Sequence, residues 1–205
     1  MNFPILSSLI LLPSIGALFL FFTKTNKENN LTVKYVALFT SLVNFFLSIY
    51  LWILFDQSTS EFQFVEDRVW IEGLINYKVG IDGISILFII LTTFITPLCI
   101  ISVNNSIKNR LSEFLIAILI MESFMIGVFC SLDLVVFYLF FEAGLIPMFL
   151  IIGIWGGARR VYSAFKFFLF TLLGSVLMLV AIISIYWISG TTDVVQLYEL
   201  GIDAK

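Results

Sequence analysis

The stretch from Leu134 to Trp155 is long and apolar enough to cross a lipid bilayer as one helix, yet it carries Glu142 near its middle. At about 1.5 Å per residue, Glu142 lies about 12 Å along such a helix, well inside a hydrocarbon layer roughly 30 Å thick. An ionised carboxylate that faced lipid there would be very unfavourable. The carboxyl must therefore be neutral, face a hydrated cavity, or meet a partner inside a helix bundle. Each of these options makes it a candidate for proton transfer.

Two neighbours of Glu142 predict a local defect in this helix. Pro147 has no amide hydrogen, so the carbonyl of Ala143 loses its helical hydrogen bond beside the acid. Gly144 removes side-chain bulk at the same level. We therefore expect a kinked and locally polar position at mid-membrane.

The composition places the whole chain among polytopic membrane proteins. Of its 205 residues, 60% are hydrophobic and 12% are charged, and the mean hydropathy is +1.09, far above that of a soluble domain. Histidine is absent and the two cysteines are isolated, which removes the usual zinc, haem and Cys–His catalytic sites. The composition gives no support for nucleic-acid binding, and redox cofactors would have to be bound by other chains.

The apolar runs predict an all-α integral membrane protein with six transmembrane helices. These cover residues 3–22, 35–55, 81–103, 112–130, 134–155 and 165–188. The first run lacks a basic segment before it and a small-residue cleavage site after it, so we interpret it as a retained helix rather than a signal peptide. Residues 56–78 alternate polar and apolar side chains in short stretches, which predicts a hairpin on the membrane surface.

This order divides the chain into three parts. Residues 1–111 form an N-terminal three-helix segment with an outer-surface hairpin loop. Residues 112–188 hold the fourth to sixth helices, and residues 189–205 form a polar tail. We expect no further domain in that tail.

The charges of the loops orient the helices. Basic residues exceed acids after the first helix, between the third and fourth, and between the fifth and sixth, where Arg159 and Arg160 lie. By the positive-inside rule, both ends of the chain then lie outside. Cys99 and Cys130 fall near opposite ends of neighbouring helices, too far apart for a disulfide, so both are expected to be free thiols.

A second acid interrupts the fourth helix. Glu122 and Glu142 are each ten residues from Leu132 in the turn that joins their helices, so both should lie about 15 Å down an antiparallel pair. A helix turns about 100° per residue, so equal depth does not fix whether the two side chains face one another. If they share a hydrated cavity, their titrations couple and a proton could pass between them through water. Alternatively, either acid is structural and hydrogen-bonded to a neighbouring helix.

Four other charged residues have simpler interpretations. Lys166 lies within a turn of the inner end of the sixth helix, where a lysine can anchor the helix at the interface. Arg159 and Arg160 are explained by the positive-inside rule. Asp82 begins the third helix on the outer side, so we expect it to cap that helix.

Several motifs together resemble one family. They are GIDGIS at 80–85, FYLFFE at 137–142, LIPM at 145–148 and KFFLFTLLGS at 166–175. These closely resemble the antiporter-like subunit 4, or chain M, of respiratory complex I. FDQST at 55–59 and FQFVE at 62–66 resemble its mitochondrial and alphaproteobacterial members in particular. The resemblance covers nearly the whole chain.

The resemblance implies a proton-translocating membrane-arm subunit of NADH:ubiquinone oxidoreductase. It implies that Glu142 matches an essential fifth-helix glutamate, Glu122 a fourth-helix acid, and Lys166 a lysine of the proton channel. The complex uses NADH, FMN, iron–sulfur clusters and ubiquinone, but this chain is expected to bind no cofactor or metal itself. Its expected partners are the other membrane-arm subunits and the lipid bilayer, in the mitochondrial inner membrane or a bacterial inner membrane.

The chain differs from this family in length. Members have about fourteen helices, arranged as two inverted repeats of about five, so residues 112–188 would form only the start of the first repeat. We therefore expect a fragment of a longer protein, or one product of a split gene whose second chain supplies the remaining helices. Alone, this piece should not pump protons.

Two other functions remain open. A subunit of a multisubunit cation/proton antiporter or of a membrane-bound hydrogenase would resemble the same family, and neighbouring genes would identify it. A purely structural assembly piece, with its acids buried for packing, is the second alternative. Glu142→Gln separates that alternative from proton transfer, because a packing role tolerates the isosteric amide.

The loop charges make a prediction about topology. A cysteine introduced at Asn29 should be shielded from a membrane-impermeant thiol reagent added outside, whereas one at Ser60 should react. Labelling of intact cells or vesicles measures both positions. The opposite pattern would contradict the assigned orientation.

Overall fold

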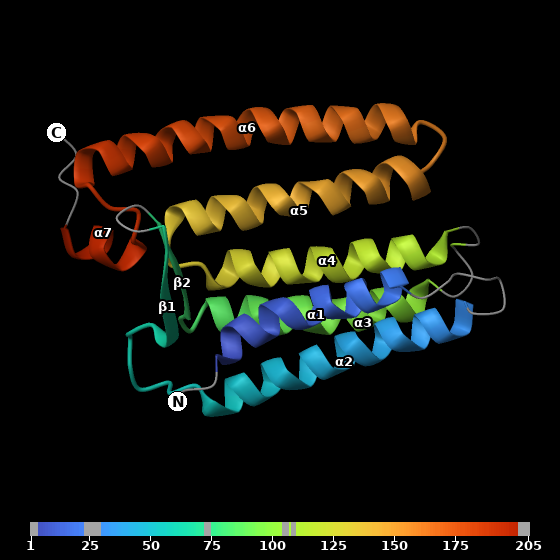
Figure 1. The fold of residues 1–205 in the computed structure, drawn as a ribbon, viewed down its shortest axis with the longest axis horizontal. Helices are drawn as coiled ribbons and strands as arrows, with labels where there is room; N and C mark the ends of the chain where they lie inside the picture. The colour runs from blue at the N-terminus through green and yellow to red at the C-terminus, as the bar shows by residue number, and fades with distance from the viewer. Residues whose placement is uncertain (1–3, 23–29, 72–74, 104–106, 108–109, 201–205) are drawn as a thin grey trace.

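The computed structural model of the chain describes residues 4–22, 30–71, 75–103, 107 and 110–200. In this part of the chain, six long helices run side by side and a two-stranded hairpin lies across one end of them (Figure 1). All six helices are long and apolar enough to cross a membrane, which confirms the predicted spans. The labelling position at residue 29 lies outside the described residues.

Nine elements make up the described part. The long helices are α1 (Ile5–Phe22), α2 (Asn30–Leu54), α3 (Ser85–Ser102), α4 (Leu111–Cys130), α5 (Leu134–Trp155) and α6 (Arg160–Ser189). The shorter elements are β1 (Gln63–Ile71), β2 (Ile75–Ile81) and α7 (Val194–Leu200).

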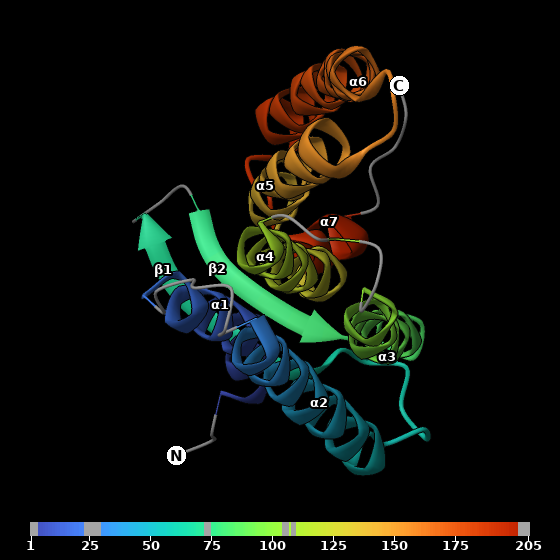
Figure 2. The same ribbon diagram turned by 90° about the vertical axis from the view of Figure 1, so that its right-hand side faces the viewer.

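The hairpin predicted within residues 56–78 is confirmed. Strands β1 and β2 pair antiparallel, with Glu66 opposite Val79 and Arg68 opposite Tyr77. Strand β2 continues to Ile81, so α3 begins at Ser85 rather than at the predicted residue 81. Figure 2 shows the hairpin crossing the end of the helix bundle, where it contacts α1, α4 and α5.

The hairpin fixes the start of α1 through one acid. The Glu66 carboxylate accepts hydrogen bonds from the backbone amides of Leu6 at 2.8 Å and Ser7 at 3.2 Å, and from the Ser7 hydroxyl. These amides are among the first in the helix, which have no partner within it, and an acid there also meets the positive end of the helix dipole. Burial raises the pKa of the nearby Tyr77 phenol, so it contacts Ser7 as a neutral group.

The capping role predicted for Asp82 is confirmed. Its carboxylate accepts a hydrogen bond from the Ser85 amide at 2.7 Å, and its carbonyl accepts one from the Ile86 amide at 3.2 Å. The Ser85 hydroxyl also donates to the same carboxylate. A short polar side chain at this position satisfies amides that the first turn of α3 leaves free.

Two helices begin earlier than the apolar pattern indicates. Helix α2 begins at Asn30 instead of residue 35, and α6 begins at Arg160 instead of residue 165. No proline or glycine lies in residues 30–34 or 160–164 to stop the helix, so each continues past the edge of its apolar run. The Arg160 guanidinium in turn donates to the Ile154 carbonyl at the end of α5, at 2.9 Å.

The tail after α6 contains the short helix α7, which the polar composition did not predict. Asp193 begins this helix, and its carboxylate accepts a hydrogen bond from the Val195 amide at 2.8 Å. Asp193 also forms an ion pair with Lys78 of β2 at 2.5 Å. The tail is therefore attached to the hairpin rather than extending away from the bundle.

The helices form two unequal groups. Helices α1 to α4 pack against one another, α5 packs on α4, and α6 packs on α5 (Figure 1). The last residues of α3, the first residues of α4 and the α5–α6 connection lie at the end opposite the hairpin and α7. Arg110, Arg159 and Arg160 lie at that same end, as the loop-charge argument requires; the side of the membrane stays a prediction.

Both cysteines are free, as predicted. Cys99 is exposed on α3 and Cys130 is buried at the last residue of α4. Because α3 and α4 lie side by side with opposite directions, the two residues are at different ends of their helices.

A cluster of hydrogen bonds around Asp133 holds the α4–α5 turn to the tail. The Asp133 carboxylate accepts from the Val135 and Val136 amides at 2.8 and 3.1 Å, which caps α5, and from the Thr192 hydroxyl at 2.6 Å. Two backbone hydrogen bonds lie beside it, from Leu134 to Thr192 and from Val194 to Leu132, each 2.9 Å. Asp133 is buried, so these partners replace the water that it loses.

Asp133→Ala should therefore lower the free energy of unfolding by about 1–3 kcal/mol, because it removes a helix cap and leaves a buried hydroxyl without its acceptor. The midpoint of thermal unfolding of the detergent-solubilised chain measures this change. Asp67→Ala, at an exposed position on β1, is the matched control and should leave the midpoint nearly unchanged. Equal effects of the two substitutions would contradict the assigned role of Asp133.

Candidate functional site

The helices α1 to α4 carry a layer of polar side chains at mid-depth. It separates two apolar clusters, one toward the hairpin end and one toward the other end. The cluster toward the hairpin end includes Leu6, Leu9, Leu51, Ile86, Ile89 and Ile126. The cluster toward the other end includes Ala17, Leu20, Val33, Ala37, Ile100, Leu115 and Leu119. The polar layer between them consists of Ser14, Ser41, Asn44, Ser48, Thr93, Glu122 and Ser123.

Glu122 occupies this layer and is bonded to α2. It is 2% exposed, and its Oε1 accepts a hydrogen bond from Nδ2 of Asn44 at 2.9 Å. Asn44 is 0% exposed. The other two oxygens of the pair, Oε2 of Glu122 and Oδ1 of Asn44, are buried and have no hydrogen-bond partner in the described part of the chain.

Two neutral pairs complete the layer. The Ser14 hydroxyl donates to the Ser123 hydroxyl at 2.8 Å, which joins α1 to α4. The Ser48 and Thr93 hydroxyls lie 2.7 Å apart and join α2 to α3. These hydroxyls are satisfied by one another, so Glu122 is the titratable group of the layer.

Glu142 lies on a different surface. It is partly exposed on α5, yet its Oε2 is buried and has no hydrogen-bond partner among the described residues. Phe149, seven residues further along, shares its helix face and packs on Phe165 and Phe168 of α6 with ring centroids 5.5 and 5.4 Å apart. Glu142 therefore belongs to the side of α5 that faces α6. Helix α5 is continuous through Pro147, so this residue does not break it.

The side chains of Glu122 and Glu142 do not face one another. Phe124 lies two residues after Glu122, and thus about 200° around α4. It packs against α5, where its ring lies 6.5 Å from that of Phe140 and its Cβ approaches Gly144. Glu122 consequently points away from α5, and no hydrogen bond in the described residues joins it to Glu142. The two acids have equal depth but separate surroundings, and Glu122 is hydrogen-bonded to a neighbouring helix, α2.

Lys166 is not brought to either acid. It is exposed in the second turn of α6, and in the described part of the chain it forms no ion pair. Its level on α6 corresponds to that of Phe149, because Phe149 contacts the adjacent Phe165. Glu142 lies seven residues, or about 10 Å, away from that level along α5. The interfacial anchor and the channel lysine both stay predictions.

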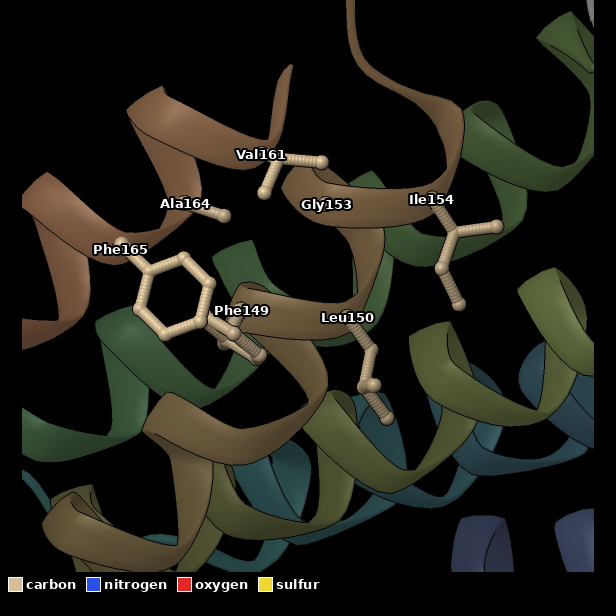
Figure 3. A pocket seen from close by; sticks show the side chains of 7 residues that line it. All are labelled: Phe149, Leu150, Gly153, Ile154, Val161, Ala164 and Phe165. Atoms are coloured by element: carbon tan, nitrogen blue, oxygen red, sulfur yellow. The ribbon is translucent and has the colours of Figure 1, made fainter.

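The structure also contains an apolar pocket between α5 and α6, shown in Figure 3. It has a volume of about 180 Å³. Its lining consists of Phe149, Leu150, Gly153, Ile154, Val161, Ala164 and Phe165. No side chain in this lining can donate or accept a proton, so the pocket is separate from the candidate chemistry.

Among the described residues, no group of three or more His, Cys, Asp or Glu residues could hold a metal ion.

Sequence reasoning missed Asn44. The signal was available, because Asn44 is a single amide within an otherwise apolar or hydroxyl-bearing span, and polar side chains in such spans commonly bond across helices. What could not be inferred was its partner, 78 residues away.

Comparison with known proteins gives consistent results. Residues 131–203 match a family model described as NADH:quinone oxidoreductase/Mrp antiporter, transmembrane. The NADH-quinone oxidoreductase subunit M of Rhodobacter capsulatus is 60% identical over 164 residues, covering 80% of this chain and 32% of that protein. The NADH-ubiquinone oxidoreductase chain 4 of Marchantia polymorpha is 48% identical over 190 residues, covering 92% of this chain and 38% of that protein.

Solved structures share the fold. A chain of respiratory complex I from Thermus thermophilus superposes with a TM-score of 0.78 at 28% identity, covering 92% of this chain and 38% of that one. A chain of the archaeal membrane-bound sulfane sulfur reductase superposes with a TM-score of 0.75 at 19% identity, covering 94% of this chain and 29% of that one, and indicates the fold alone. The chain thus spans about a third to two fifths of the length of the curated relatives it matches.

Proposed function

We propose that the chain belongs to the family of antiporter-like subunits that includes subunit M and chain 4 of NADH:quinone oxidoreductase, and that it forms part of a proton-translocating membrane-arm subunit of that complex. In this role it takes part in an enzyme that couples electron transfer from NADH to a quinone with proton movement. Electron transfer belongs to other subunits, and this chain binds none of the NADH, FMN, iron–sulfur or quinone cofactors.

The observation that carries the proposal is the position of Glu142. Glu142 lies at mid-depth of a membrane helix, and one of its oxygens is buried without a partner among the described residues. Such an acid lowers stability, and acids are therefore found at these positions mainly where they have a function. A carboxyl group can hold and release a proton at such a site when its surroundings change between turnover states. We therefore assign proton transfer to Glu142, with Glu122 and Lys166 as auxiliary groups.

The exposed faces of α5 and α6 suggest where the partners lie. Only 17% of α5 and 11% of α6 are buried over their apolar windows, against 50% for α4. We infer that further helices, corresponding to the remaining length of the relatives, cover this side and complete the surroundings of Glu142. Other membrane-arm subunits and lipid then surround the whole, in the mitochondrial inner membrane or an alphaproteobacterial cell membrane.

A subunit of a multisubunit cation/proton antiporter is the second candidate. The matching family model covers both classes, which is the observation in its favour. The identities of 44–60% to NADH-quinone and NADH-ubiquinone oxidoreductase subunits favour the first candidate. A purely structural role would not explain why Oε2 of Glu142 is buried without a hydrogen-bond partner among the described residues.

Glu142→Gln in the assembled complex should abolish proton pumping and lower NADH:ubiquinone activity about tenfold or more, because the amide cannot carry the proton. Pumping into sealed vesicles and NADH oxidation measure the two effects. Glu61→Gln, an exposed acid before β1, is the matched control and should leave both unchanged.

Assembly distinguishes this result from misfolding. The Glu142→Gln complex should migrate on native gels like the unmodified one, since glutamine has nearly the same volume as glutamate. Unchanged pumping in a correctly assembled variant would falsify the proposed role of Glu142.

A further inference from the structure

The pair formed by Asn44 and Glu122 lies wholly inside the described helices, away from lipid and from the exposed side of α5. Asn44 is 0% exposed and Glu122 is 2% exposed, and apolar clusters lie on both sides of them. Whatever covers α5 and α6 in a complete subunit therefore leaves this pair in the same surroundings. The described helices alone therefore determine the surroundings of the Asn44–Glu122 pair.

Two oxygens of the pair lack a hydrogen-bond partner in the described part of the chain. Asn44 Nδ2 donates to Glu122 Oε1, while Oδ1 of Asn44 and Oε2 of Glu122 are both buried without a partner in the described residues. An ionised glutamate is only an acceptor, so it could satisfy neither oxygen. A protonated glutamate loses the charge that burial opposes and still accepts the Asn44 amide at Oε1, so it is the form that these surroundings favour.

Among the described residues, the elements packed around Glu122 place no cation beside it to balance a negative charge. Helix α4 packs against α1, α2, α3, α5 and β2. The titratable side chains on those elements are Lys34, Tyr35 and Tyr50 of α2, Cys99 of α3, Tyr138 and Glu142 of α5, and Tyr77 and Lys78 of β2; α4 itself adds Glu113 and Cys130.

The two lysines of this set are engaged elsewhere. Lys78 pairs with Asp193 at the hairpin end. Lys34 donates to the Ile101 carbonyl at the other end, ten residues and thus about 15 Å along α2 from Asn44. Glu142 shares the depth of Glu122 but lies beyond the Phe124 face of α4 and could not compensate a negative charge in any case.

We propose that Glu122 holds a proton in the resting protein and that Asn44 is the positioning residue that orients its carboxyl group. The two form a buried proton-holding pair between α2 and α4, apart from the Glu142 side of the molecule. The proposal rests on the proposed function for its role in pumping, but the protonation of Glu122 follows from these contacts alone. The ligand of the site is the proton itself.

Infrared spectroscopy of the assembled complex tests the protonation directly and needs no turnover. A protonated Glu122 gives a carboxylic C=O stretching band that disappears in Glu122→Gln. Because the Asn44 amide donates to Oε1, Asn44→Leu should move this band to higher frequency. Asn44→Gln keeps an amide, so its band should lie closer to the frequency of the unmodified protein. Absence of any band assigned to Glu122 would overturn the proposal, as would an unchanged band in Asn44→Leu.

A matched control separates positioning from packing. Ser48→Ala removes a buried hydrogen bond of α2 one turn away, to Thr93, without touching Glu122. If Asn44 positions Glu122, Asn44→Leu lowers pumping about two- to tenfold and moves the infrared band, while Ser48→Ala leaves the band in place. If Asn44 serves only packing, neither variant moves it and the proposal fails. Should Asn44→Leu not assemble, the Glu122→Gln difference band and Asn44→Gln still decide the question.

The outcomes also separate this inference from the proposed function. Full pumping by Glu142→Gln together with the expected Glu122 band would overturn the proposed function and leave the protonated pair standing. Loss of pumping in Glu142→Gln without an infrared band from Glu122 would support the proposed function and overturn the protonated pair.

Discussion

The structure depends on one constraint, the absence of water from the hydrocarbon layer. Backbone groups satisfy it by forming six long helices, and side chains satisfy it by pairing across helices where they are polar. In α1 to α4 the polar side chains that pair across helices meet in one layer, with an apolar cluster on either side. The pairs Ser14–Ser123, Ser48–Thr93 and Asn44–Glu122 join all four helices through that layer. Hydroxyls outside this layer, such as those of Thr40 and Thr92, donate to carbonyls of their own helix.

Where the chain returns to water, acids fix the ends of the helices. Glu66 binds the first amides of α1, Asp82 caps α3, and Asp133 caps α5 while it accepts from Thr192. All three carboxylates lie at the hairpin end, where they meet the positive ends of helix dipoles. The acids at the hairpin end, on which the predicted orientation in the membrane depends, thus also hold the hairpin, the α4–α5 turn and the described part of the tail together.

The two mid-membrane acids differ in what surrounds them. Glu122 is enclosed by helices that are all present in this chain, so its environment is complete. Glu142 lies on the side of α5 toward α6, the two least buried of the six spans. A closed site suits the storage of a proton, whereas an open side leaves room for groups that supply or accept one. This difference explains why equal depth along two adjacent helices does not make the acids equivalent.

The sequence by itself determined the six spans, the surface hairpin, the Asp82 cap, the free cysteines and the equal depth of Glu122 and Glu142. Each of these depends on distance along the chain or on local polarity. Only the tertiary structure decided that Glu122 bonds to Asn44 and faces away from α5, and that Asp133 and Asp193 attach the tail. In a soluble helix the apolar stripe indicates which side faces the core. In a membrane, lipid and protein interior are similarly apolar, so the pattern of these helices contains little information about their rotation.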